Sequence, residues 1–326
     1  LDGFPSRTFE RKGYKYSDKT RWRDSPDEEW EWKGHTSSDE FVSYLFVTFM
    51  MDKFIVKTEA EKRRVSHFFE QIMNHLIKND YYFIDVDGKP TLWGRWNPDY
   101  VNWYPKTIVD RRTQSIELIA GLQLAYHLTG KEIYKSEAYR MINEHGYVDN
   151  ILIDVFGFKE TPGYIHEGAD MGSGGWNHLD DHLSFMSYWV LTSYAFPEYL
   201  ESYKKAINNH WKAETSERNS LWEMISYATT GIFNEESVFW HLREFPLDLI
   251  RYKIMNSHRK DLIFREDNFR NEYLNTPLSP LERPVHRHNS NNFRVDAQGF
   301  DDDSREMSGD EYLLPYWMAR YLKVIE

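Results

Sequence analysis

Apolar residues recur at helical spacing along most of the chain, and short polar turns separate them into antiparallel pairs. The first helix is predicted to begin at Ser37, because Ser37 and Glu40 form the Ser-x-x-Glu pattern of a capping box. A second apolar face follows over residues 58–78. The link between the two segments is short, so we expect them to be antiparallel neighbours.

The clearest helix pair lies over residues 113–128 and 131–142. Both segments carry apolar residues on one face, and Gly130 stands just after the first of them. Glycine is common at that position because it adopts left-handed dihedrals at little cost. The other predicted helices cover residues 179–195, 197–213, 220–231, 235–244 with a continuation to 250, and 312–324. These patterns predict four helix pairs and one closing helix.

Two segments depart from the helical pattern. Residues 82–86 and 91–93 flank an Asp-Gly turn, which predicts a small β-hairpin. Residues 1–36 are polar and aromatic without a helical period, and we expect an extended N-terminal arm there. The remainder, 37–326, is predicted to be one helical domain.

Long polar connections interrupt this domain near residues 81–111, 148–177 and 256–310. They lead into the first helices of pairs, whereas the links within pairs are short. If the first helices form an inner ring, the long connections gather at one end of it. Active sites are commonly built from such loops on a rigid scaffold.

One helix joint resembles that of a known enzyme group. Leu124-Ala-Tyr-His-Leu-Thr-Gly-Lys-Glu-Ile-Tyr134, followed by Ala138, is similar to the helix–Thr-Gly–helix joint of (α/α) toroid carbohydrate enzymes. These include six-hairpin glycoside hydrolases, unsaturated uronyl hydrolases and several polysaccharide lyases; tetratricopeptide-like arrays use similar joints. The hairpin 85–93 and the tail 312–317 resemble features of bacterial proteins in this group.

The resemblance implies an all-α fold of antiparallel helix hairpins with a small β-hairpin insertion. Four to five pairs fall short of the six of a closed ring, so a complete or an incomplete (α/α) toroid is expected. It also implies an axial cleft lined by the N-terminal ends of the inner helices. The fold alone does not identify the chemistry.

Composition narrows the classes of partner. Aromatic residues make up 17% of the 326 residues, with 12 Trp and 22 Tyr. Such side chains fill cores, and they also stack on the C–H faces of sugars. A net charge of −12 argues against nucleic-acid binding. There is no cysteine and no apolar run of membrane-spanning length. Together with the resemblance, the aromatic content makes an oligosaccharide or polysaccharide the expected partner.

The chain starts at Leu1 without a methionine or a signal peptide, which we interpret as a mature or shortened form. The compartment is not predicted, although a periplasmic or secreted location fits these features best. The oligomeric state is not predicted either.

A first candidate catalytic group is His35, Asp39 and Glu40, at the predicted start of the first helix. Two carboxylates and an imidazole are suitable general acids and bases. The structural alternative is strong for Glu40, which closes the capping box. Asp39 has no such obligatory role and only complements the helix dipole.

A second candidate group is His178, Asp180 and Asp181. His178 and His182 are four residues apart, which is metal-ligand spacing on a helix, but no Glu stands between them as in zinc proteases. We therefore predict acid/base or sugar-contact roles here, and no metal or cofactor.

Two further sets are predicted to bind substrate, because indoles stack on sugars and guanidinium groups pair with carboxylates. They are Trp93, Arg95, Trp96, Arg111 and Arg112 near the hairpin, and His258, Arg259, His286 and His288 in the late loop. Toroid lyases use a similar His/Arg/Asn set to neutralise a uronate and remove its C5 proton. The structural alternative is that Arg111 and Arg112 only bridge acidic surface residues.

Three functions remain open at this stage. The first is carboxylate-catalysed hydrolysis of glycosidic bonds in an oligosaccharide or polysaccharide, including one with uronic acid. The second is β-elimination by a polysaccharide lyase. The third is a non-catalytic helical-repeat module that binds glycan or protein. Serine-hydrolase, phosphate-loop and dinucleotide motifs are absent from the sequence.

Overall fold

The computed structural model describes residues 2–13, 21–173, 178–250, 252–265, 274–284, 291–297 and 306–326. Helices dominate this part of the chain, and the strands form small antiparallel sheets. The mainly helical class predicted from the sequence is therefore confirmed. The chain divides into two compact units. Unit 1 comprises Leu1–Pro105, Asp110–Ile151 and Val190–Leu200, and unit 2 comprises Lys106–Val109, Leu152–Trp189 and Glu201–Glu326.

Unit 1 contains most of the paired strands and the first helices. Its elements are β1 (Thr8–Arg11), β2 (Trp22–Asp24), β3 (Trp30–Lys33), α1 (Ser38–Met50), η2 (Met51–Ile55), α2 (Glu59–Lys78), β4 (Tyr82–Ile84), β5 (Pro90–Arg95), α3 (Pro98–Trp103), nearly all of α4 (Val109–Thr129), α5 (Glu132–Asn143) and α6 (Tyr147–Ile151). The predicted hairpin about Asp87-Gly88 is present as β4 and β5.

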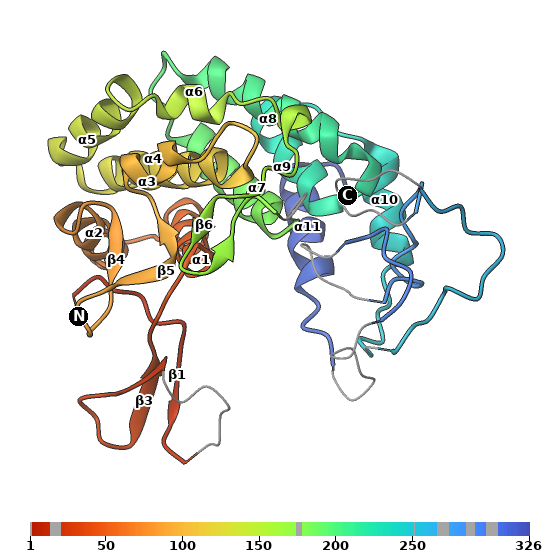
Figure 1. The fold of residues 1–326 in the computed structure, drawn as a ribbon, viewed down its shortest axis with the longest axis horizontal. Coiled ribbons are helices and arrows are strands. Elements are labelled where there is room, and N and C mark those ends of the chain that lie inside the picture. The colour runs from red at the N-terminus through yellow and green to blue at the C-terminus, as the bar shows by residue number, and fades with distance from the viewer. Residues whose placement is uncertain are drawn as a thin grey trace. The chain divides into compact units, whose positions relative to one another are not determined.

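The N-terminal segment is a sheet where the sequence analysis expects an extended arm. Its strands are antiparallel in the order β1-β3-β2, and both Thr8 and Trp22 pair with Lys33. In Figure 1 this sheet, drawn in red, extends away from the helices of unit 1. The alternation of Trp and Glu in β3 has the period of a strand, so the extended segments pair with one another.

The first two helix pairs have the predicted ends. Ser37 caps α1 and Thr58 caps α2, each with a complete capping box. Between α4 and α5, Gly130 has a φ of 67°, and its N–H donates to the carbonyl of Tyr126 at 2.8 Å. A left-handed glycine ends α4 there and starts the turn into α5.

Helix α4 is an interior helix of unit 1. Every residue from Arg112 to Ala125 is buried, so the helix has no broad solvent face. Gly121 allows α1 to approach closely, because a Cβ atom on Gly121 would lie 2.8 Å from the ring of Phe41. The Phe41 ring in turn lies 4.7 Å from that of Trp96. These contacts place an aromatic core beneath the start of α1.

Unit 2 is built from later helices and a long irregular segment. Its elements are η3 (Val155–Gly157), β6 (Ile165–His166), β7 (Ala169–Asp170), most of α7 (His178–Ser193), most of α8 (Leu200–Glu214), η4 (Thr215–Glu217), α9 (Ser220–Thr230), α10 (Glu235–Glu244) and α11 (Asp310–Tyr321). Phe185 stacks on Trp222 in its core, with ring centroids 5.0 Å apart. α9 contacts both α10 and α11.

Short helices and one helix end differ from the sequence expectation. α3 and α6 span too few residues to show a helical period, although Asn97 caps α3 and Pro98 occupies its first turn. The predicted continuation of α10 to residue 250 is a turn instead. Pro246 explains this, because proline disfavours helical dihedrals in the residue before it, here Phe245.

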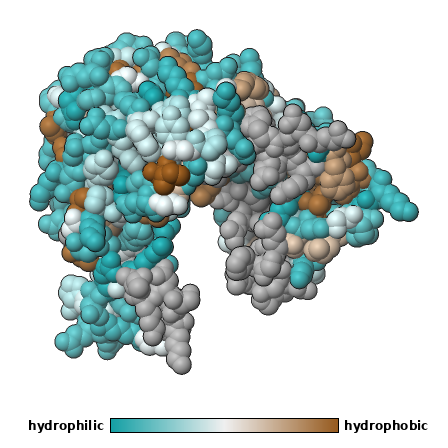
Figure 2. Space-filling view, viewed as in Figure 1, coloured by the Kyte–Doolittle hydropathy of each residue, from teal (hydrophilic) through white to brown (hydrophobic). Residues whose placement is uncertain are grey.

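On the face shown in Figure 2, the described residues are mostly hydrophilic, and the hydrophobic ones form small separate groups. Within the described ranges, no helix combines the length and apolar character needed to cross a membrane.

Candidate functional site

The first turn of α1, in unit 1, holds two of the predicted carboxylates beside an arginine. Glu40 accepts hydrogen bonds from the backbone N–H of Ser37 at 2.7 Å and from its hydroxyl at 2.8 Å. Arg7 lies 2.9 Å from Glu40 and 3.6 Å from Asp39. Glu40 thus fulfils the capping role that its position predicts, whereas Asp39 makes the looser contact with the guanidinium.

Asp39 has the properties of an acid/base group. Its side chain is 38% exposed, so it can reach solvent or a ligand. Burial raises its pKa above the ordinary value for aspartate, the negative charge of Glu40 adds to that rise, and Arg7 and Ser37 oppose it. A raised pKa keeps a carboxyl group protonated at higher pH, as a general acid requires.

His35 stands before this turn in a strained conformation. Its φ is 56°, and its backbone N–H donates to the carboxylate of Asp85 at 3.0 Å. Arg23 reaches the same carboxylate oxygen at 3.2 Å. Asp85 therefore joins the hairpin to the segment that leads into α1. The backbone of His35, rather than its ring, makes this link.

β5 lies directly against the start of α1. A Cβ atom on Gly94 would lie 2.8 Å from the backbone nitrogen of Ser38, and the φ of Gly94 is 75°. Trp93, the preceding residue, is 38% exposed, which leaves part of its indole available to a ligand. The hairpin therefore fixes the backbone next to Asp39.

Trp96 and Arg112, which the sequence predicts as substrate contacts, are interior residues. The indole of Trp96 is fully buried and donates its N–H to Glu117 at 2.7 Å. Arg112 is 1% exposed, and its Nε donates to the carbonyl of Ile151 at 3.1 Å. Neither side chain offers a face to a sugar in this structure.

Arg95 and Arg111 also support the protein itself. The Nε of Arg95 donates to the carbonyl of Thr91 at 2.7 Å, and its guanidinium lies over the ring of Tyr100. Arg111 donates to the side chain of Asn150 at 2.8 Å and to the carbonyl of Tyr104 at 2.7 Å. These N–H groups of the two guanidinium side chains already bond to groups of the protein. The prediction that they bind a carboxylate of the substrate is weaker for that reason.

The three residues predicted at the start of α7, in unit 2, differ in burial. Asp180 is partly exposed, whereas Asp181 and His178 are buried. His178 Nδ1 lies 2.9 Å from a carboxylate oxygen of Glu217, which is fully buried. The ring of His178 therefore faces a carboxylate in the interior.

Asp181 belongs to a buried polar cluster that the sequence analysis missed. His210 Nε2 lies 2.8 Å from Asp181 Oδ1, and its Nδ1 lies 2.8 Å from the hydroxyl of Tyr188. Glu214, one turn further along α8, completes a group of three residues whose possible ligand atoms lie within 4.8 Å of one another. The spacing of His210 and Glu214, four apart on one helix, was the signal available in the sequence.

Two other buried carboxylates lie in unit 2. Glu223 accepts from the backbone of Asn234 at 2.7 Å and from the indole of Trp211 at 2.8 Å, yet burial raises its pKa to about 7. Glu311 lies 2.6 Å from Arg283 and 3.4 Å from His241. Burial lowers the pKa of His241, although the bond to Glu311 opposes this.

The late-loop candidates divide between exposed and undescribed residues. His258 is exposed. Arg259 forms ion pairs with Asp261 at 2.6 Å and with Glu282 at 3.1 Å. His286 and His288 lie outside the described residues. The predicted β-elimination set therefore stays a prediction.

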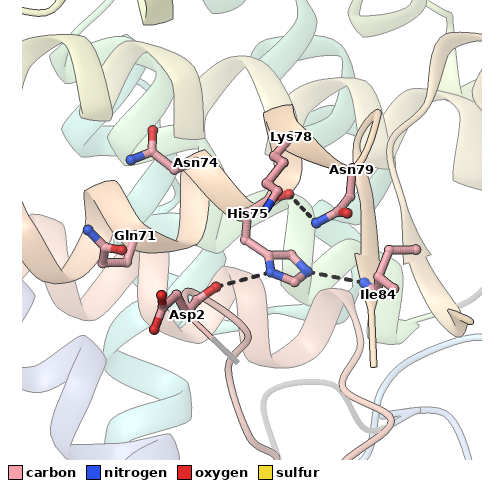
Figure 3. A pocket seen from close by; sticks show the side chains of 7 residues that line it. All are labelled: Asp2, Gln71, Asn74, His75, Lys78, Asn79 and Ile84. Carbon is pink, nitrogen blue, oxygen red and sulfur yellow. Dashed lines mark hydrogen bonds between the residues drawn. The ribbon is translucent and has the colours of Figure 1, made fainter. Parts of the chain in front are cut away.

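A pocket in unit 1 lies between the N-terminal segment and α2, with a cavity volume of about 460 Å³. It is lined by Asp2, Gln71, Asn74, His75, Lys78, Asn79 and Ile84. In Figure 3 the ring of His75 is held on both sides, by the carbonyl of Asp2 and by the N–H of Ile84, each at 3.1 Å. Burial lowers the pKa of His75. The imidazole here acts as a neutral structural link.

Comparisons of the chain with models of protein families, with curated proteins and with solved structures found no match.

Proposed function

We propose that the protein is a carbohydrate-active enzyme that hydrolyses glycosidic bonds, with Asp39 as a general acid. The observation that carries this proposal is the half-buried Asp39 carboxyl at the first turn of α1, with a raised pKa and 38% exposure of its side chain. Hydrolysis of a glycosidic bond needs a carboxylic acid that protonates the leaving oxygen. In this proposal, the carboxyl group of Asp39 takes that role.

The surroundings of Asp39 support this role. Arg7 is close enough to Asp39 to limit the rise of its pKa. Glu40 closes the capping box, so in this proposal Glu40 has a structural role and Asp39 the catalytic one. Trp93, in the strand packed against α1, supplies a partly exposed indole of the kind that stacks on sugars. The helix pair with its Thr-Gly joint fits the (α/α) toroid arrangement, which we include in the proposal.

The contacts that three arginines make within the protein favour hydrolysis over elimination. Arg111, Arg112 and Arg259 already engage carbonyl, amide or carboxylate groups of the protein. A lyase needs such a cation to neutralise the uronate carboxylate before a base removes the neighbouring proton. We therefore expect a substrate whose binding does not depend on an ion pair between a uronate and these arginines.

The test is digestion of a panel of neutral and uronate-containing glycans. Hydrolysis releases new reducing ends without the ultraviolet absorbance of a C4–C5 double bond, whereas elimination produces both. Asp39→Asn should abolish reducing-end release while leaving the circular dichroism spectrum and melting temperature nearly unchanged. Glu40→Gln keeps the capping box, because glutamine can replace glutamate there, and should retain turnover.

Three outcomes would overturn the proposal. Full turnover by Asp39→Asn removes Asp39 from the mechanism. Absorbance that accompanies every cleavage indicates a lyase. Glycan binding without any cleavage across the panel supports the helical-repeat binding module instead.

A further inference from the structure

The N-terminal sheet of unit 1 sorts its side chains by face. Residues that pair across neighbouring strands lie on the same side of a sheet, and successive residues of one strand lie on opposite sides. Phe9 and Arg23 both pair with Trp32, and Arg11 pairs with Trp30. These five residues form what we call the aromatic face. Among the strand positions, this face carries two arginines and no carboxylate.

The opposite face of the same sheet is acidic. Glu31 pairs with Glu10 on one side and with Asp24 on the other, and Lys33 is the cation among the strand positions of this face. The three carboxylates are therefore kept away from the arginines of the aromatic face. Because the whole chain has a net charge of −12, the aromatic face is a local positive surface on an acidic protein.

The half of the aromatic face nearest the helices anchors the sheet. The ring of Trp32 lies edge-on to that of Phe4, with centroids 6.1 Å apart. Arg23 donates to the carboxylate of Asp85, in the loop of the β4–β5 hairpin, at 3.2 Å. These contacts hold the sheet to unit 1, so the rest of the face is presented from a fixed base.

The far half of the face is accessible. Phe9 is 69% exposed, Arg11 is exposed and Trp30 is partly exposed. The guanidinium of Arg11 lies over the ring of Trp30 at 5.5 Å, and the ring of Phe9 lies 5.7 Å from it. Figure 1 shows this sheet extending away from the helices. Flat rings beside a stacked guanidinium provide apolar surface for the C–H faces of sugars and a cation for an acidic substituent.

The sheet is continuous with the turn that carries Asp39. Arg7, the residue before β1, donates its backbone N–H to the carbonyl of Lys33 at 3.0 Å, and its guanidinium lies 3.6 Å from Asp39. Phe9 follows Arg7 by two residues, about 7 Å along an extended strand. A glycan of several sugar units on the sheet is therefore held close to the proposed acid.

We propose that the aromatic face binds an anionic glycan chain. Phe9 and Trp30 stack on its sugar rings, and Arg11 pairs with a carboxylate or sulfate group. A second copy of this chain is the competing occupant, but tight protein interfaces resemble a core, and the strand positions of this face include no aliphatic residue. The use of the bound chain as a substrate rests on the proposed hydrolysis at Asp39, whereas the binding itself does not.

The experiment uses the full chain with Asp39→Asn, so that cleavage does not consume the ligand. Isothermal titration calorimetry measures binding of oligosaccharides from pectate, alginate and hyaluronan, which carry carboxylates, and from a carrageenan that carries only sulfate. Carboxyl-reduced pectate is the neutral counterpart. We expect anionic oligosaccharides to bind more tightly than the neutral one, and the difference to shrink as salt is added. The class that binds identifies the anion.

Variants locate the surface. Arg11→Gln should weaken binding of the anionic ligand about fivefold and leave binding of the neutral one unchanged. Phe9→Ala should weaken both, by about 2- to 10-fold. Lys33→Gln and Thr8→Ala are the matched controls, because they make similar changes on the opposite face and should bind like the parent protein. Circular dichroism checks that each variant is folded.

Three outcomes would overturn this proposal. The first is that no oligosaccharide binds. The second is an equal loss in Arg11→Gln and Lys33→Gln, which indicates unspecific attraction. The third is dimerisation that Phe9→Ala abolishes, without glycan binding, which assigns the face to a second copy. An unmodified protein that binds these glycans through Arg11 and Phe9 but cleaves none would remove the hydrolysis and leave the binding surface in place.

Discussion

Gly94 of β5 lies so close to Ser38 of α1 that a Cβ atom on Gly94 would come within 2.8 Å of the backbone nitrogen of Ser38. This contact joins the hairpin to the helix turn that carries Asp39. It also explains why this position is a glycine, since its φ of 75° is unfavourable for other residues. The position of the proposed acid therefore depends on a backbone contact.

Gly94→Ala should both destabilise the protein and reduce its hydrolytic activity. The left-handed backbone costs about 1–2 kcal/mol for alanine, and the crowding against Ser38 adds about 1–3 kcal/mol. Gly88→Ala is the matched control, because Gly88 has a φ of 76° and nothing within 4 Å of an added Cβ. Urea unfolding measures the stability of both variants, and the release of reducing ends measures their activity. Equal losses in the two variants would show that the contact with Ser38 does not matter.

The pH dependence of activity should respond in opposite directions to changes at Arg7 and Glu40. Arg7 lowers the pKa of Asp39 and Glu40 raises it. If protonated Asp39 is the acid, activity falls as the pH rises through its pKa. Arg7→Ala should therefore move the alkaline limb of the kcat/KM profile to higher pH, and Glu40→Gln should move it to lower pH. Lys12→Ala, which removes an ion pair with Asp24, serves as the control. Shifts of the same sign would contradict the assignment.

Local patterns predicted the helices well because their signals are contained within a few residues. The capping box at Ser37 and the left-handed Gly130 are both present as expected. The paired strands at the N-terminus were missed because each is only three or four residues long, and because residues 12–29 separate β1 from its partner β3. Pairing of that kind depends on contacts that the local pattern does not contain.

The candidate site was harder to predict, because burial decides what a polar side chain can do. Trp96 and Arg112 resemble ligand-binding residues in a sequence, but they are interior residues with partners of their own. The group around His210 was missed for the opposite reason. Its acidic member on α7 lies 29 residues away along the chain, and only the packing of two helices brings them together.

Glu223 should make the protein less stable as the pH rises from about 4.5 to about 7. Its pKa is raised from 4.5 to about 7 by burial, so the folded state holds the proton more tightly than the unfolded state does. The stabilisation is complete below the unfolded pKa and is lost as the pH passes the folded one, a change of about 3 kcal/mol.

Urea unfolding between pH 4 and pH 8 tests this effect. Glu223→Gln should flatten the dependence in that range, because the amide keeps an oxygen for Trp211 and Asn234 but does not ionise. Glu235→Gln, on the exposed first turn of α10, should retain the dependence of the unmodified protein. An unchanged slope in Glu223→Gln would assign the dependence to other groups.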